Sequence, residues 1–98
     1  MGKKRTLLTK REIQSLVSKY DWTLNKKETE LSKVFLFDTY VKGLVFIARI
    51  TVHAEVLSHH PDIEFSYGKV KVKLTTHELK GLTKLDAVLL ERIETLSQ

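Results

Sequence analysis

The longest apolar stretch of the chain is residues 40–57, YVKGLVFIARITVHAEVL. Its β-branched residues favour a strand, but no turn signal follows its one glycine, and the stretch far exceeds a usual strand of about 5 to 6 residues. We therefore expect one long helix that begins at Thr39 or Tyr40 and runs to Ser58. Pro61 is expected to end it, because proline disfavours helical geometry in the residue that precedes it.

The apolar run of this helix is interrupted by Lys42, Arg49, His53 and Glu55. Each would be costly in hydrocarbon, so we expect no insertion into a membrane. A helix this apolar needs cover on more than one side. One face can meet a sheet and another a second subunit, so a homo-oligomer is expected; burial inside a larger monomer core is the alternative.

The segment before the long helix predicts one helix and two strands. Thr9 and Glu12 have the spacing of a capping box, so a helix is expected to begin there and to end near Asp21. A short strand can begin at Trp22, and a polar turn joins it to an alternating strand over residues 31–38. Trp22 is expected to anchor the core, because an indole buries a large apolar area; ligand stacking is the alternative.

Two more strands and a helix are expected after Pro61. Residues 63–67 alternate, Gly68 permits a turn, and residues 69–75 alternate between inward apolar side chains and outward lysines. We expect the lysine row to be the solvated face of a sheet, with anion binding as the alternative. Thr83 can cap the last helix.

The order of elements is therefore helix, strand, strand, helix, strand, strand, helix. It predicts a two-layer α+β fold, with a four-stranded, mainly antiparallel sheet and three helices on one face. The 98 residues suggest a single domain over residues 1–98, of which residues 1–8 are expected to be a flexible tail.

Composition narrows the classes of function. The net charge of +5 invites a nucleic-acid interpretation, but 12 acidic residues are interleaved with the basic ones, and nucleic-acid binding needs clustered charge. We therefore do not favour nucleic acid as a partner. The chain has no cysteine and its basic N-terminus lacks the apolar run of a signal peptide, so a cytoplasmic location is expected.

Three of the four histidines are candidates for acid–base chemistry. His59 and His60 are adjacent near the predicted end of the long helix, and His77 follows the last strand. Histidine can give or take a proton near neutral pH, and the last hairpin returns His77 toward the other two. Glu55 lies four residues before His59 and could orient its imidazole, while Asp86 could hold one imidazole or anchor a polar ligand.

Zinc is the competing interpretation of this cluster, because three histidines and a carboxylate could ligate it. The chain lacks a His-x-x-x-His pair, however, and side chains at consecutive positions usually point in different directions. We therefore expect no metal site.

The combined pattern resembles the pterin-4a-carbinolamine dehydratase family over nearly the whole chain. The residues that carry the resemblance are Ala54 and Glu55, SHHP at 58–61, Tyr67, Lys69 and Val70, LTTH at 74–77, GLTK at 81–84 and Asp86, with Trp22 and the aromatic strand at Phe35 and Phe37. The chain departs from the family at Ile63, where many members carry tryptophan, and at Leu79 and Lys80, where small residues are common.

The resemblance implies a hydro-lyase, 4a-hydroxytetrahydrobiopterin dehydratase, that removes water from a 4a-hydroxytetrahydropterin without metal or cofactor. It further implies that His59 and His77 are the acid–base groups and that His60 chiefly binds substrate. The residues expected to bind substrate or orient the imidazoles are Glu55, Pro61, Thr76 and Asp86.

The resemblance also implies partners. It predicts a tetramer built from dimers, with the long helix in the subunit bundle. A non-catalytic alternative is a helix-mediated dimerisation cofactor of another protein, such as a transcription factor. A role around molybdopterin is a further alternative.

Overall fold

The computed structural model describes residues 6–98 of the chain. The elements, in chain order, are α1 (Lys10–Tyr20), β1 (Thr23–Leu24), β2 (Leu31–Leu36), α2 (Tyr40–Leu57), β3 (Asp62–Ser66), β4 (Lys69–Leu74), the 3-10 helix η1 (His77–Leu79) and α3 (Lys84–Leu96). The predicted order of three α-helices and four strands is confirmed, and η1 is an addition that the sequence pattern did not predict.

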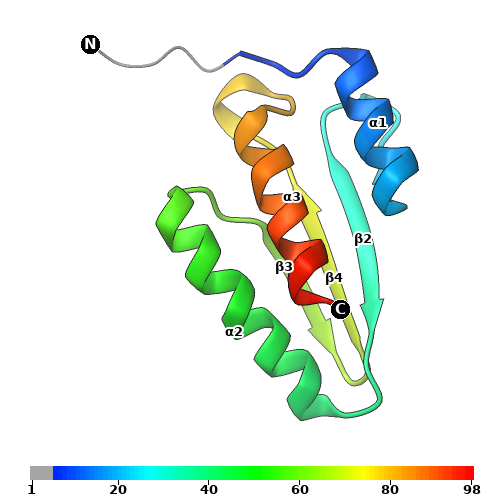
Figure 1. Ribbon diagram of the computed structural model, residues 1–98, viewed down its shortest axis with the longest axis vertical. Helices are drawn as coiled ribbons and strands as arrows, with labels where there is room; N and C mark the ends of the chain where they lie inside the picture. Colours follow the sequence, from blue (N-terminus) through cyan, green and yellow to red (C-terminus); the bar gives the residue numbers. More distant parts are fainter. Residues whose placement is uncertain (1–5) are drawn as a thin grey trace.

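The four strands form one sheet in the order β1-β2-β4-β3, and every pairing is antiparallel. β3 and β4 are joined by a tight turn in which Gly68 has φ +75°, a conformation that costs glycine no Cβ clash. β4 also pairs along its whole length with β2, so α2 carries the chain from one side of β4 to the other (Figure 1).

The two faces of the sheet differ as predicted. Val70, Val72 and Leu74 of β4 are fully buried beneath the helices, whereas the lysines that alternate with them lie on the opposite face. The core joins inward residues of the strands to residues of all three helices, including Ile13, Phe46, Ile50, Leu89, Leu90 and Ile93. The predicted two-layer α+β fold is therefore confirmed (Figure 1).

Trp22 anchors the core, as expected. It is 2% exposed and meets the ring of Phe35 edge to face, with 6.0 Å between the ring centroids. Its Nε1 donates to Glu94 of α3 over 2.8 Å, and Lys33 Nζ reaches the same carboxylate over 2.7 Å. The indole therefore has both the apolar cover and the hydrogen-bond partner that a buried tryptophan requires.

Both ends of α2 are set by local signals. At the start, Thr39 Oγ1 accepts from the backbone N–H of Lys42 over 3.1 Å. At the end, Ser58 adopts the left-handed conformation with φ 50°, and its N–H returns to Glu55 O over 3.2 Å. The helix therefore ends close to the predicted residue, at Ser58, and Pro61 lies four residues after Leu57, the last helical residue.

One side of α2 packs on the molecule and the other is exposed. Gly43 lies so close to the sheet that an added Cβ would be 2.8 Å from Phe65 Cε1. The large apolar residues of α2 that are exposed are Tyr40, Val41, Leu44, Val45, Val52 and Val56. No helix among residues 6–98 has the length and apolar character that crossing a membrane would require.

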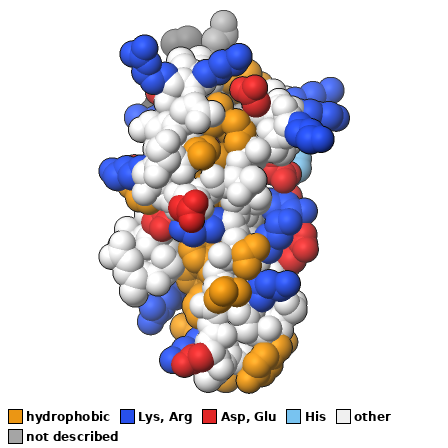
Figure 2. All heavy atoms as spheres, turned by 90° about the vertical axis from the view of Figure 1, so that its right-hand side faces the viewer, with side chains coloured by type: hydrophobic (Ala, Val, Ile, Leu, Met, Phe, Trp, Pro, Cys, Tyr) orange, Lys and Arg blue, Asp and Glu red, His pale blue; other side chains and the backbone are white. Residues whose placement is uncertain are grey.

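The predicted tail falls largely outside the described residues, which begin at residue 6. Within the described part, Leu7 forms a β-bridge with Thr83, and Leu8 N donates to Leu82 O over 2.7 Å. These two residues are therefore tied to the segment before α3. On the face of the molecule shown in Figure 2, basic and acidic side chains are interleaved around apolar patches.

Candidate active site

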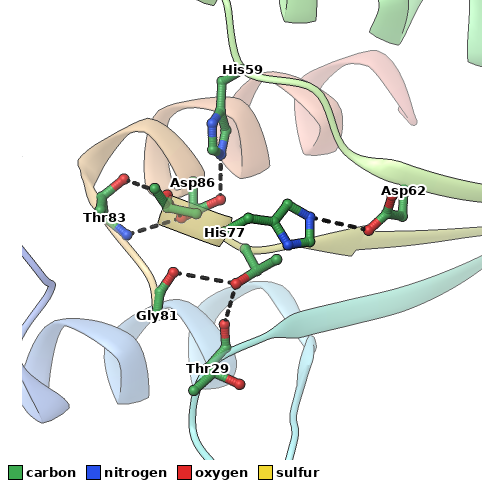
Figure 3. A network of polar contacts seen from close by, with 9 residues as sticks. Thr29, His59, Asp62, His77, Gly81, Thr83 and Asp86 are labelled. Carbon is green, nitrogen blue, oxygen red and sulfur yellow. Dashed lines mark hydrogen bonds and ion pairs between the residues drawn. The ribbon is translucent and has the colours of Figure 1, made fainter. Parts of the chain in front are cut away.

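The three candidate histidines line one pocket of about 210 Å³. It lies where the end of α2, the end of β4 and η1 meet (Figure 3). The pocket is lined by Ser58, His59, His60, Thr75, His77 and Glu78. Three larger surface grooves, of about 300, 370 and 430 Å³, contain no histidine. The chain thus gathers side chains capable of proton transfer at one place.

His59 is the buried histidine of the pocket. Its side chain is 8% exposed, and its Nε2 lies 2.5 Å from Asp86 Oδ1 (Figure 3). An ionised carboxylate can only accept hydrogen bonds, so Nε2 carries the proton of this contact. Nδ1 is then the ring nitrogen that is left for a ligand in the pocket.

Asp86 is fully buried, and its carboxylate accepts hydrogen bonds from three groups. Besides His59, its other oxygen accepts from Thr76 Oγ1 over 2.7 Å and from the backbone N–H of Thr83 over 2.9 Å. Thr83 is the N-cap of α3, so the carboxylate lies at the N-terminus of a helix, where unpaired N–H groups favour negative charge. Asp86 thus contacts one of the three candidate imidazoles, that of His59.

Thr76 supports Asp86 rather than the ligand. It is fully buried, and its Oγ1 lies 2.8 Å from Thr83 Oγ1. Because Thr76 Oγ1 donates to Asp86, the hydroxyl of Thr83 must be the donor in this contact. The backbone of Thr76 also bonds to Gly81 O over 2.8 Å, which fixes the loop that carries His77.

Glu55 contacts a different histidine from the one predicted. Its Oε2 lies 2.5 Å from Nε2 of His60, and both side chains are well exposed. The spacing of four residues failed because α2 ends at Leu57, so His59 no longer lies on the helical face of Glu55. His59 instead turns into the protein toward Asp86.

Asp62 is a neighbour of the site that the sequence did not indicate. Its Oδ2 lies 3.7 Å from Nε2 of His77, and the two side chains are 64% and 75% exposed (Figure 3). Each histidine of the pocket therefore has its own carboxylate: Asp86 for His59, Glu55 for His60 and Asp62 for His77. The position of Asp62 at the start of β3, next to a returning β4, was the available signal.

Thr75 connects the pocket to the loop between β1 and β2. Its Oγ1 donates to Thr29 O over 2.6 Å, and Asn25 fixes that loop by accepting from the N–H groups of Thr29 and Glu30. Pro61, in contrast, lies between α2 and β3 and is not among the lining residues. Within residues 6–98, no three His, Cys, Asp or Glu side chains are grouped so that they could hold a metal ion.

Comparisons with known proteins point to one family. The family model of pterin 4 alpha carbinolamine dehydratase matches residues 6–96. A provisionally named pterin-4-alpha-carbinolamine dehydratase of Picosynechococcus is 40% identical over 82 residues, which is 83% of this chain and 87% of that protein. One of Sulfurisphaera tokodaii, also provisionally named, is 37% identical over 90 residues, which is 91% and 95% of the two chains.

Solved structures agree with this family. The crystal structure of a transcriptional coactivator/pterin dehydratase from Brucella melitensis matches with a TM-score of 0.88 and 26% identity, over 95% of this chain and all of that one. A pterin dehydratase-like protein described as a RuBisCO assembly factor in the alpha-carboxysome matches at 0.67 and 23% identity, over 78% and 88%, and shares the fold. The chain belongs to the pterin 4 alpha carbinolamine dehydratase family.

Proposed function

We propose that the chain is a dehydratase that removes water from 4a-hydroxytetrahydropterins, with 4a-hydroxytetrahydrobiopterin as a substrate. The observation that carries the proposal is the pocket that brings His59, His60 and His77 together beside a fully buried Asp86. Membership of the family supports the same chemistry.

The reaction requires one proton donor and one proton acceptor. The C4a–O bond breaks as an acid protonates the hydroxyl, which leaves as water, while the N5 lone pair forms the C4a=N5 bond. A base then accepts the N5 proton, which gives the quinonoid dihydropterin. Imidazoles suit both steps near neutral pH, and we assign them to His59 and His77.

The three imidazoles are held with different firmness, which suits different roles. Asp86 fixes the ring of His59 and directs Nδ1 to the pocket, so this histidine is preorganised for proton transfer. His60 is exposed and paired with Glu55 at the rim, so we assign it to binding of the pterin ring. Asp86 and Thr76 are fully buried and would act by orienting His59.

A homo-oligomer is part of the proposal. The exposed apolar residues of α2, among them Val52 at 62% and Val56 at 71% exposure, would be covered by the same helix of other subunits. A dimer of dimers is the expected form. A mass near 11.3 kDa by light scattering at working concentration would contradict it.

Protein binding is the second candidate function. The same exposed face of α2 favours it, because a helix presenting apolar side chains can dock on another protein as well as on a copy of itself. The words transcriptional coactivator in the name of the Brucella melitensis protein point the same way. This function would need no histidine of the pocket.

The two candidates are separated by stopped-flow measurement of dehydration of chemically generated 4a-hydroxytetrahydrobiopterin. We expect the natural chain to exceed the buffer rate, and His59→Ala and His77→Ala each to lower kcat by about 10²-fold to 10⁴-fold, the usual contribution of an acid–base group. His53→Ala is the matched control, since His53 lies on α2 outside the pocket. A natural chain no faster than buffer would favour protein binding. If the natural chain is active, a panel of pterins that includes molybdopterin precursors identifies the preferred substrate.

A further inference from the structure

The ring of His77 is the least constrained of the three in the pocket. Its side chain is 75% exposed and begins the short helix η1, where the backbone is fixed by the bond from Lys80 N to His77 O over 3.1 Å. Within residues 6–98, the one ion pair of this ring is the contact of Nε2 with Asp62, at 3.7 Å. The direction of the imidazole therefore depends on that carboxylate.

Asp62 lies opposite a lysine that makes its hydrogen-bonded ion pair with another carboxylate. The register of the β3–β4 hairpin places Asp62 opposite Lys73, which would be its natural partner. Lys73 Nζ instead lies 3.0 Å from Glu64 Oε2. This contact raises the pKa of Lys73 and lowers the pKa of Glu64, as expected for a hydrogen-bonded ion pair.

We propose that Asp62 is a positioning residue for His77: it accepts from Nε2–H and so turns Nδ1 of the same ring over the pocket, opposite His59. The proposal rests on the proposed dehydratase function, in which His77 transfers a proton. Asp62 is not among the residues that line the pocket, so it acts through the histidine rather than on the substrate. The 3.7 Å contact is an ion pair, and because both side chains are exposed, the proposal requires only that they rotate to within about 3 Å, the distance of a hydrogen bond.

The test compares two exposed aspartates. Asp62→Asn removes the charge beside His77, and Asp38→Asn removes a charge that contacts Lys42 outside the pocket. We expect Asp62→Asn to lower kcat/KM for dehydration by about twofold to fivefold, the range of an exposed ion pair, and Asp38→Asn to leave it unchanged. Asp62→Glu should recover part of the loss.

A second measurement needs no activity. Proton–nitrogen NMR spectra of the imidazoles at mildly alkaline pH report which ring nitrogen carries the proton. In the natural chain and in Asp38→Asn we expect His77 to be protonated mainly at Nε2, and in Asp62→Asn to be a mixture of both tautomers. An unchanged tautomer in Asp62→Asn, or equal kinetics of the two variants, would overturn the proposal. If the natural chain lacks dehydratase activity, the proposed function fails, while the tautomers still test the contact itself.

Discussion

His59 and His60 are adjacent in the sequence, but their surroundings are opposite. The side chain of His59 is 8% exposed and contacts Asp86, which is itself fully buried and accepts three hydrogen bonds. The side chain of His60 is 60% exposed and contacts Glu55, which is 69% exposed. The contact distances are the same, 2.5 Å, so the difference lies in the solvent around the pairs.

The distance between a histidine and a carboxylate therefore does not alone determine how much the pair contributes to stability. In the buried pair, loss of one partner leaves polar groups without water or hydrogen bonds, which is costly. In the exposed pair, water and salt replace the partner. The buried pair should therefore support both the fold and the chemistry, and the exposed pair only the chemistry.

The largest effect is expected from Asp86→Ala. The change removes the acceptor of His59, Thr76 and the Thr83 backbone, so we expect the free energy of unfolding to fall by about 3–5 kcal/mol. Urea denaturation followed by circular dichroism measures it. Glu55→Ala is the control and should change stability by less than about 0.5 kcal/mol. An equal loss in the free energy of unfolding for the two variants would contradict the expected difference between the buried and the exposed pair.

Thr76→Val should have a smaller effect, because it removes one donor to Asp86 and keeps the shape of the side chain. We expect a loss of about 1–3 kcal/mol in the free energy of unfolding, since Asp86 and the Thr83 hydroxyl each lose a buried partner. Thr51→Val, at an exposed site on α2, provides the comparison in the same urea experiment. If Thr76→Val lowers the free energy of unfolding no more than Thr51→Val does, the buried hydrogen bonds of Thr76 do not stabilise the fold.

Glu55→Gln should change activity without changing stability. We expect kcat/KM for dehydration to fall by about twofold to fivefold because His60 loses its charged partner at the rim. The gap between the natural chain and the variant should narrow when salt rises from about 0.01 M to about 1 M, because exposed charges are screened. Stopped-flow rates at both salt concentrations test this, and a gap that salt leaves intact would show that the pair behaves as a buried one.

The smallest effect concerns Glu64, an exposed carboxylate with a lowered pKa. Its hydrogen bond to Lys73, and then the charge of that lysine, lower the pKa in the folded chain. Folding therefore gains from its ionised form above the usual pKa of glutamate, and this gain disappears as the pH falls through the lowered value. The difference in stability between the natural chain and Glu64→Gln should shrink on acidification. A difference that grows at acid pH would contradict the sign.

The sequence predicted the fold well because the signals were local. The capping box at Thr9, the alternation along β4 and the lack of a turn signal within α2 each depend on neighbouring residues. The strand order β1-β2-β4-β3 did not follow from the sequence, since the pairing of β2 with β4 joins segments more than 30 residues apart. η1 was not predicted for a different reason: with three residues it is too short to give a periodic pattern.

The candidate site residues come together in the structure, but not all of their contacts follow from the sequence. His59, His60 and His77 line one pocket, and Asp86 contacts the imidazole of His59. Glu55 was expected beside His59 but contacts His60. The helix ends at Ser58, before His59, so the four-residue spacing no longer places Glu55 and His59 on one helical face. Asp62 was missed because its contact with His77 depends on the β3–β4 register and on η1 together.

The most direct test of the proposed chemistry is a double-mutant cycle of His59→Ala and His77→Ala, measured as the stopped-flow rate of water loss from 4a-hydroxytetrahydrobiopterin. If both imidazoles act in one elimination, the double variant should be about as slow as the slower single variant, because groups that act as a unit are not additive. Single variants as fast as the natural chain, or a natural chain no faster than buffer, would contradict the assignment of the pocket as the site of dehydration.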